Sequence, residues 1–176
     1  MSCLAISPHV ESPRLRLRGV CRTDLARLAE LANDYDVAKM TGSMPYPYGL
    51  ADAEAFLEKT HSADPLTNAQ FVIDQGGEAI GSLGFFPGDF GRTEVGYWLG
   101  RPSWGQGLAT EALNAALDWA RTDWRRKLVV AGHFADNPAS GQVLVKAGFL
   151  YTGDVTPKFS TARGGEAPTR MMVWLA

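Results

Sequence analysis

The segment Trp104–Thr110 contains two glycines in a pattern suited to binding an anion. Gly105 and Gly107 precede a stretch with helical periodicity, so the peptide N–H groups at the start of that helix have no acceptor within it. The helix dipole adds partial positive charge there, and glycine lets a phosphate approach the backbone closely. These properties predict a pyrophosphate ligand that needs neither a metal ion nor a lysine.

Other phosphate-binding motifs fit this turn poorly. A P-loop ends in Gly-Lys-Ser/Thr, and the dinucleotide-binding motif is Gly-x-Gly-x-x-Gly after a first strand; the turn matches neither. A Gly-x-Gly pair before a helix is also ordinary as a tight turn without a ligand. The turn alone leaves both interpretations open, and the surrounding elements must decide between them.

Hydrophobic periodicity predicts the elements that position this turn. In chain order, the patterns predict a strand (14–20), two helices (25–32 and 51–60), three strands (70–74, 79–86 and 93–99), a helix (108–121), a strand (127–131), a helix (137–146) and two strands (149–154 and 169–175). The aromatic-rich segment 40–50, with its prolines and glycines, is predicted to be a loop.

This order predicts an α/β (α+β) fold with a mixed, mostly antiparallel sheet of about seven strands and about four flanking helices, in a single domain over residues 1–176. The three strands between residues 70 and 99 should form an antiparallel meander. The next step, through the long helix to 127–131, should be a right-handed parallel crossover. The glycine turn would then lie at the carboxyl end of a strand, where α/β folds bind ligands.

Composition narrows the functional class. The 17 basic and 19 acidic residues give a net charge of −2, so we expect neither nucleic acid nor a membrane surface as a partner. Cys3 and Cys21 are too few for a disulfide framework, and no metal-ligand cluster forms around them or the three histidines. No run approaches the about 20 apolar residues of a membrane span, and residues 1–10 lack a signal-peptide pattern. We therefore expect a cytoplasmic protein without a metal.

Three motifs resemble those of the GNAT acyltransferases. Glu94-Val-Gly-Tyr-Trp-Leu-Gly is followed by Trp104-Gly-Gln-Gly-Leu-Ala-Thr-Glu-Ala-Leu, then by Asn137-Pro-Ala-Ser140 and Lys146-Ala-Gly148-Phe149, in the order found in that family. The resemblance covers nearly the whole chain and is greatest to the branch containing ribosomal-protein N-terminal alanine acetyltransferases. It implies a GNAT fold, acetyl-CoA as cosubstrate and a primary amine as acceptor.

The same resemblance assigns a cofactor site. The family pattern Gln/Arg-x-x-Gly-x-Gly/Ala falls on Trp104, Gly107 and Ala109, with an aromatic residue in the first position, as is common in this branch. It implies that backbone N–H groups of the turn hold the pyrophosphate, and that backbone at residues 99–101 pairs with the pantetheine arm. The predicted cofactor site comprises Leu99, Gly100, Arg101, Trp104, Gly105, Gln106, Gly107, Leu108, Ala109, Thr110, Asn137 and Ser140.

Amine acetylation needs a base for the ammonium group and a proton for the departing thiolate. Glu94 is the expected base, with His133 as a lower-ranking alternative. Ser140 is the expected acid: Leu144, which cannot donate a proton, stands where many family members have a tyrosine, and Ser140 resembles the serine used instead in the alanine acetyltransferase branch. Asn137 and Ser140 would share one helix face, although both residue types also cap helices.

The oxyanion of the reaction needs a hydrogen-bond donor. A backbone N–H near residues 97–99 is expected to supply it, at a strand bulge that Gly96 would permit.

Met44, Tyr46 and Tyr48 lie in the loop that borders the acceptor in relatives, and with Glu94 they form the predicted substrate-binding group. Packing of these three side chains against the first two helices is the alternative.

Taken together, these features predict an acetyl-CoA-dependent N-acetyltransferase in which a primary amine, of a small molecule or a protein N-terminus, attacks directly in a ternary complex. The alternative is a catalytically inactive GNAT-fold module that binds acyl-CoA and regulates. The sequence does not identify the acceptor, and it leaves the oligomeric state open, a homodimer being one option.

Overall fold

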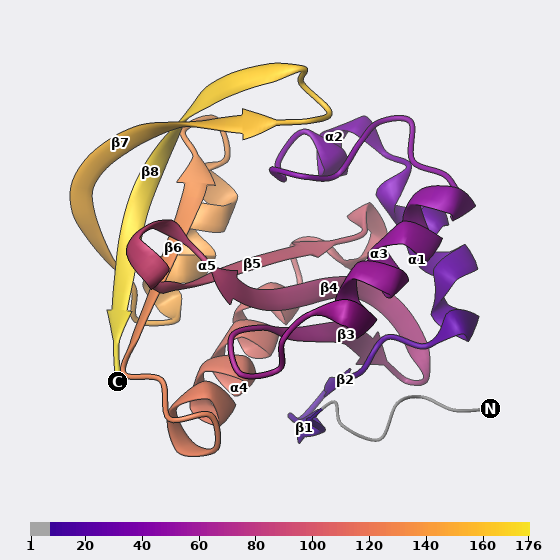
Figure 1. Ribbon diagram of the computed structural model, residues 1–176, viewed down its shortest axis with the longest axis horizontal. Helices are drawn as coiled ribbons and strands as arrows, with labels where there is room; N and C mark the ends of the chain where they lie inside the picture. The colour runs from indigo at the N-terminus through magenta and orange to yellow at the C-terminus, as the bar shows by residue number, and fades with distance from the viewer. Residues whose placement is uncertain (1–7) are drawn as a thin grey trace.

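The computed structural model describes residues 8–176 and places eight strands in one sheet (Figure 1). Residues 1–7, which include Cys3 and most of the N-terminal segment considered above, lie outside the described residues. The strands are β1 (Val10–Glu11), β2 (Arg16–Arg18), β3 (Ala69–Gln75), β4 (Glu78–Pro87), β5 (Thr93–Leu99), β6 (Leu128–Phe134), β7 (Leu150–Ser160) and β8 (Gly165–Leu175). The helices are α1 (Leu25–Ala32), α2 (Tyr35–Ala38), α3 (Leu50–Ser62), α4 (Leu108–Thr122) and α5 (Pro138–Lys146).

The sheet order is β1-β2-β3-β4-β5-β6-β8-β7, and every neighbouring pair is antiparallel except β5 with β6. The predicted meander over β3, β4 and β5 is confirmed, and so is the parallel step through α4 into β6. The glycine turn therefore follows the carboxyl end of β5, as the order of elements predicts.

The two parallel strands separate soon after they meet. Within residues 8–176, β5 and β6 are in register at one position, where Glu94 lies beside Val130. From there β5 continues to Leu99 and β6 to Phe134, and Figure 1 shows β6 rising away from β5, which runs across the view. The sheet thus opens between the carboxyl ends of these strands, at the end that carries the glycine turn.

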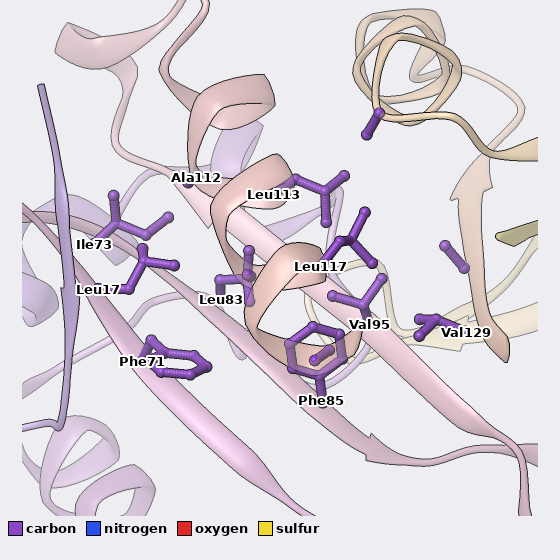
Figure 2. Packing of buried hydrophobic residues seen from close by; sticks show 14 of the residues in the cluster. Leu17, Phe71, Ile73, Leu83, Phe85, Val95, Ala112, Leu113, Leu117 and Val129 are labelled. Carbon is purple, nitrogen blue, oxygen red and sulfur yellow. The ribbon is translucent and has the colours of Figure 1, made fainter. Parts of the chain in front are cut away.

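Helices cover both faces of the sheet. Buried residues of α4 and α5 pack on one face, where Leu113 and Leu117 meet Leu83, Phe85 and Val95 (Figure 2). On the other face, α1 and α3 pack against β3 and β4. The longest helix, α4, has 15 residues, and nowhere between residues 8 and 176 is a helix long and apolar enough to cross a membrane.

The fold class is confirmed, with three differences of detail. The structure has eight strands and five helices where about seven and about four are predicted, because the two-residue β1 and the four-residue α2 are too short to show periodicity. β7 and β8 have 11 residues each, and most of β7 is exposed, so it has no alternating pattern. The bulge expected at Gly96 is absent from the β4–β5 ladder, whose register is unbroken from Thr93 to Leu99.

Replacing Leu113 with alanine should destabilise the protein by about 2–5 kcal/mol, because the side chain is fully buried between α4 and the sheet and its removal leaves a cavity. Leu66→Ala is the matched control: Leu66 is 75% exposed, and its loss should change the free energy of unfolding by less than about 0.5 kcal/mol. Urea unfolding measures both. Equal effects would contradict the core position of α4.

Candidate active site

The glycine turn presents a row of backbone donors. Gly105 (φ 71°) and Gly107 (φ 74°) adopt the left-handed conformation, and α4 begins directly after Gly107. The Glu111 N–H donates to the Gly107 carbonyl, which is the first bond of the helical ladder. The N–H groups of residues 108–110 therefore find no acceptor in the described part of the chain. This arrangement fits a pyrophosphate on geometry as well as on residue type.

A hollow of about 590 Å³ adjoins the turn, and residues that line it include Gly107, Thr110, Asn114 and Lys146. It supplies space for a large ligand beside the free N–H groups, with one cation from α5 at its edge.

Arg14, near the N-terminus, contacts both the glycine turn and the first turn of α4. Its guanidinium donates to the Gln106 carbonyl at 3.0 Å and pairs with the Glu111 carboxylate at 2.7 Å. The Gln106 side chain folds back and donates to the Pro102 carbonyl at 3.0 Å, so it points away from the hollow. No sequence pattern predicts the Arg14–Glu111 pair, whose members are 97 residues apart.

Trp104 stands where the family pattern has Gln or Arg, and its side chain contacts neighbouring residues of the chain. The indole N–H donates to the Leu99 carbonyl at 2.8 Å, and the Arg101 guanidinium lies 5.3 Å from the centre of a Trp104 ring. Arg101 itself is held by the Asp34 and Asp36 carboxylates, each at 2.7 Å. These contacts fix the path of the chain between β5 and the glycine turn.

The contacts of residues 99–101 revise the expected backbone pairing with pantetheine. The Gly100 N–H donates to the Ile80 carbonyl of β4, and the Leu99 carbonyl is occupied by Trp104. Because backbone groups alternate in direction along a strand, the N–H groups of Tyr97 and Leu99 face the opening beside β6, whereas that of Val95 lies where β5 still pairs with β6. Leu99 thus keeps its predicted position at the opening, whereas the Gly100 N–H does not face it.

Ser140 and Tyr97 bridge the opening on the α5 side. The Tyr97 hydroxyl lies 2.9 Å from Ser140 Oγ and 3.2 Å from the Ser140 carbonyl oxygen. Asn137 begins α5 and accepts the Ser140 N–H on its side-chain oxygen at 3.3 Å, so its capping role is observed. Burial raises the pKa of Tyr97 to about 12, since it disfavours the phenolate, and the Ser140 bond opposes this only partly.

Glu94 lies on the opposite face of β5 from Tyr97, since the two side chains are an odd number of residues apart on one strand. It stands across from Phe86 of β4. Burial raises its pKa, Lys158 lowers it and Asp89 raises it further. Lys158 and Asp89 form an ion pair at 3.0 Å. A desolvated carboxylate with a raised pKa, at the position from which β5 and β6 separate, is a candidate general base.

His133 is directed elsewhere. It is 5% exposed, and its two ring nitrogens lie 2.9 Å from the Phe134 carbonyl oxygen and 3.0 Å from the Tyr151 hydroxyl. Both nitrogens are therefore engaged away from Glu94, which leaves Glu94 as the better placed base.

In the aromatic-rich loop, residues 40–50, two of the three predicted substrate-binding side chains are packed and one is exposed. Met44 is 9% exposed in a small cluster with residues of α1 and α2, and Tyr48 packs beside it. Burial raises the pKa of Tyr48 to about 12. Only Tyr46 is largely exposed, edge-on to Tyr35 at 5.4 Å between ring centres. The packing alternative is thus observed for Met44 and Tyr48, and Tyr46 remains the exposed member of the group.

The tip of the β7–β8 hairpin lies close to α2, as Figure 1 shows. The Thr161 N–H donates to the Gly42 carbonyl at 2.9 Å, and the Arg163 guanidinium donates to the Lys39 carbonyl at 2.7 Å. Arg163 also pairs with Asp136, which precedes α5, at 2.8 Å. The hairpin tip therefore joins the two halves of the opened sheet, although no motif in the sequence predicts these contacts.

Among residues 8–176, no group of three or more histidine, cysteine, aspartate or glutamate side chains could hold a metal ion.

A family model described as the acetyltransferase (GNAT) domain matches residues 14–150, which is most of the chain. The chain belongs to the GNAT acetyltransferase family. It is accordingly an N-acetyltransferase, with acetyl-CoA as its acyl donor. The turn, the opening beside β5 and the adjoining hollow are the parts of this GNAT domain that fit such a donor.

Known relatives agree with the branch indicated by the motifs. The chain is 27% identical to the uncharacterized N-acetyltransferase p20 of Bacillus licheniformis over 80% of its length and 81% of that protein. It is 35% identical to the ribosomal-protein-serine acetyltransferase of Escherichia coli over 47% of its length and 48% of that protein. In fold it resembles Mycobacterium smegmatis RimJ in complex with CoA-disulfide, with a TM-score of 0.82 and 21% identity over 96% of this chain and 86% of that one.

Gly107→Ala should weaken CoA binding at least about fivefold. A side chain at φ 74° costs about 1–2 kcal/mol, so the turn will relax and the N–H groups of residues 108–110 will lose their common direction. Gly76→Ala, at φ 64° in the β3–β4 turn, carries similar strain far along the chain from the site and should lower stability without changing CoA affinity. Calorimetric titration with CoA measures both variants. Wild-type affinity in Gly107→Ala would remove the turn from the site.

Proposed function

We propose that this GNAT enzyme transfers the acetyl group directly to a primary amine in a ternary complex, with Glu94 as base and Ser140 acting on the leaving thiolate. One observation carries the proposal: the sheet opens between β5 and β6, with the free N–H groups of α4 at its mouth and Glu94 and Ser140 on its two sides. The cosubstrate supplies the thioester; an amide bond forms as the C–S bond breaks.

The two faces of β5 would serve different parts of the reaction: one would hold the acetyl-CoA, and the other would meet the acceptor amine. The glycine turn would hold the pyrophosphate of CoA, and the Leu99 N–H is a strand donor available to the pantetheine arm. The backbone N–H of Tyr97, which also faces the opening, is then the candidate for the oxyanion. An acceptor approaching from the other face would meet Glu94 first.

Ser140 can reach a leaving sulfur with its O–H only if another donor satisfies its oxygen. The Tyr97 hydroxyl lies 2.9 Å from Ser140 Oγ, where either oxygen can be the donor, and we propose that Tyr97 donates when the Ser140 O–H turns toward the sulfur. The pKa of Tyr97, about 12, lies well above the about 8.5 of an ordinary thiol, so full transfer of a proton to the thiolate would be uphill from Tyr97 and still more so from the less acidic Ser140 hydroxyl. Ser140 would therefore stabilise the thiolate by donating a hydrogen bond to it. Tyr97 therefore stays protonated and serves as a positioning residue for the Ser140 hydroxyl.

Glu94 is proposed to take the proton from the acceptor ammonium. Its burial beside Phe86 raises its pKa toward the range useful for a base, whereas an ordinary exposed glutamate would hold a proton too weakly. An α-amino group, with an ordinary pKa of about 7.7–8.0, needs a weaker base than a lysine-like amine at about 10.4.

The acceptor is proposed to be a primary amine, with a protein N-terminus as the first candidate and a small-molecule amine as the second. The first is favoured because the relative that is 35% identical is named a ribosomal-protein-serine acetyltransferase. The inactive regulatory module receives no support from any of these observations.

Release of free thiol from acetyl-CoA tests the function, with N-terminal peptides, polyamines and aminoglycosides as acceptors and a calorimetric titration of CoA beside it. Turnover with N-terminal peptides alone would support the first acceptor class. Binding of CoA without turnover on any acceptor would favour the regulatory module.

Ser140→Ala should lower kcat at least about tenfold with nearly unchanged CoA affinity, because the hydroxyl acts on the departing thiolate. Tyr97→Phe should lower kcat about two- to tenfold, the value of one hydrogen bond, since the ring still packs. The double variant should be no slower than Ser140→Ala, because Tyr97 acts through Ser140. Losses that multiply in the double variant would assign Tyr97 an independent role.

The acid limb of the kcat/KM profile should lie above the about 4.3 of an ordinary glutamate, since the base must be deprotonated and burial raises the pKa of Glu94. Lys158→Met should move this limb to higher pH, because Lys158 lowers that pKa and its loss leaves Asp89 to raise it further. Lys158→Arg keeps the charge and is the control.

Glu94→Gln should move the acid limb up to the pKa of the acceptor amine, so its loss of activity should shrink at high pH, where the amine is already deprotonated. An equal loss at every pH would assign Glu94 to positioning of the acceptor and leave the base unidentified.

A further inference from the structure

A separate hollow of about 330 Å³ lies on the far side of α5 from the acetyl-transfer site. Leu144 and Ala147 of α5 pack into the main core with α4. Gly141, Gln142 and Val145 line the hollow instead, on the helix face that looks toward β6, β7 and β8. The hollow is thus separated from Tyr97 and Ser140 by the body of the helix.

A histidine–tyrosine pair forms the inner wall of this hollow. The His133 nitrogen that faces the Phe134 carbonyl must be the donor there, so the other nitrogen accepts the Tyr151 O–H at 3.0 Å in a neutral ring. Both groups press against the bare backbone of Gly141: a Cβ at that position would lie 2.7 Å from His133 Nε2 and 2.8 Å from the Tyr151 oxygen. Glycine at 141 therefore makes room for the pair.

Arg170 lies at the rim of this hollow, where it contacts an aromatic ring. Its guanidinium lies 4.6 Å from the centre of the Tyr151 ring. No carboxylate in the part of the chain that the structure describes pairs with Arg170 or with Lys146, the second cation of the hollow. Arg101 and Arg163, by contrast, are each fixed by aspartates.

We propose that this hollow is a second ligand site, which binds a small molecule carrying a carboxylate or phosphate group. The Arg170 guanidinium, oriented by Tyr151, would bind the anion with its forked N–H donors. Lys146 and the Gln142 amide lie near enough to line the same space, and the lining contains no acidic side chain to repel an anion.

The size and lining restrict the ligand further. A volume of about 330 Å³ is at the small end of the range for ligand pockets, about 300–1,000 Å³. Pro138 and Val145 give an apolar wall, so the molecule is compact, with at least one anionic group and a short hydrocarbon body. It would sit against Gly141, one residue beyond Ser140.

The test titrates inorganic phosphate and, separately, succinate into the whole chain by calorimetry, with and without saturating CoA. CoA should occupy the glycine turn, so heat that persists in its presence reports the hollow. Phosphate or succinate should bind at one site, and whichever binds identifies the anion class. Arg170→Gln should weaken this binding at least about tenfold, as the loss of a charged bidentate partner does.

Two further variants sharpen the result. Tyr151→Phe keeps the stacked ring under Arg170 and should weaken binding less than Arg170→Gln. Arg92→Gln is the matched control, because Arg92 is also exposed, lies over the Phe90 ring at 5.9 Å and stands outside the hollow; its affinity should be unchanged. Thermal unfolding checks that all three variants fold.

Absence of binding by both anions, or equal affinity in Arg170→Gln and the wild type, would overturn the proposal. Competition by CoA that abolishes all binding would also overturn it, since the anion would then be reporting the glycine turn. A chain that failed to bind CoA would contradict the proposed function, yet the effect of Arg170→Gln on phosphate or succinate binding could still be measured.

Discussion

The divergence of β5 from β6 is the constraint on which the rest of this structure depends. Two parallel strands joined by a helix would normally stay paired, but here they share one position, Glu94 beside Val130, and then separate. The separation leaves N–H groups of β5 without strand partners, at the place where α4 starts with free N–H groups of its own. A fully paired sheet would have neither the opening nor the donors along it.

An open sheet edge is stable only if other contacts hold its two sides, and here they come from distant parts of the chain. Tyr97 reaches Ser140 across the opening on the α5 side. At the other end, Arg163 of the β7–β8 hairpin joins the Lys39 carbonyl to Asp136. These contacts fix the width of the opening before any ligand arrives, which lowers the ordering cost of binding.

The two faces of β5 give the same strand two electrostatic environments. Val95, Tyr97 and Leu99 face the apolar core under α4, where burial raises the pKa of a phenol to about 12. Glu94 is on the other face, where burial is opposed by Lys158. Helix α5 is likewise shared: one face carries Ser140 toward β5, and the other lines the hollow beside His133 and Arg170. Alternation along a strand and around a helix is therefore what separates these sites.

The sequence by itself determined the features that depend on neighbouring residues. Period-2 and period-3.6 patterns predicted the meander and the long helices, and Gly105 and Gly107 predicted a turn suited to an anion, because these properties follow from local sterics and side-chain spacing. The capping position of Asn137 is local in the same way. The order of elements then located the turn at the end of β5.

Only the tertiary structure decided which distant residues meet. The bonds from Tyr97 to Ser140 and from Arg14 to Glu111 join residues 43 and 97 positions apart, and the burial of Met44 and the engagement of His133 also depend on packing across elements. No periodicity encodes such distances, since they are set by how the sheet twists, where β5 leaves β6 and how the β7–β8 hairpin closes.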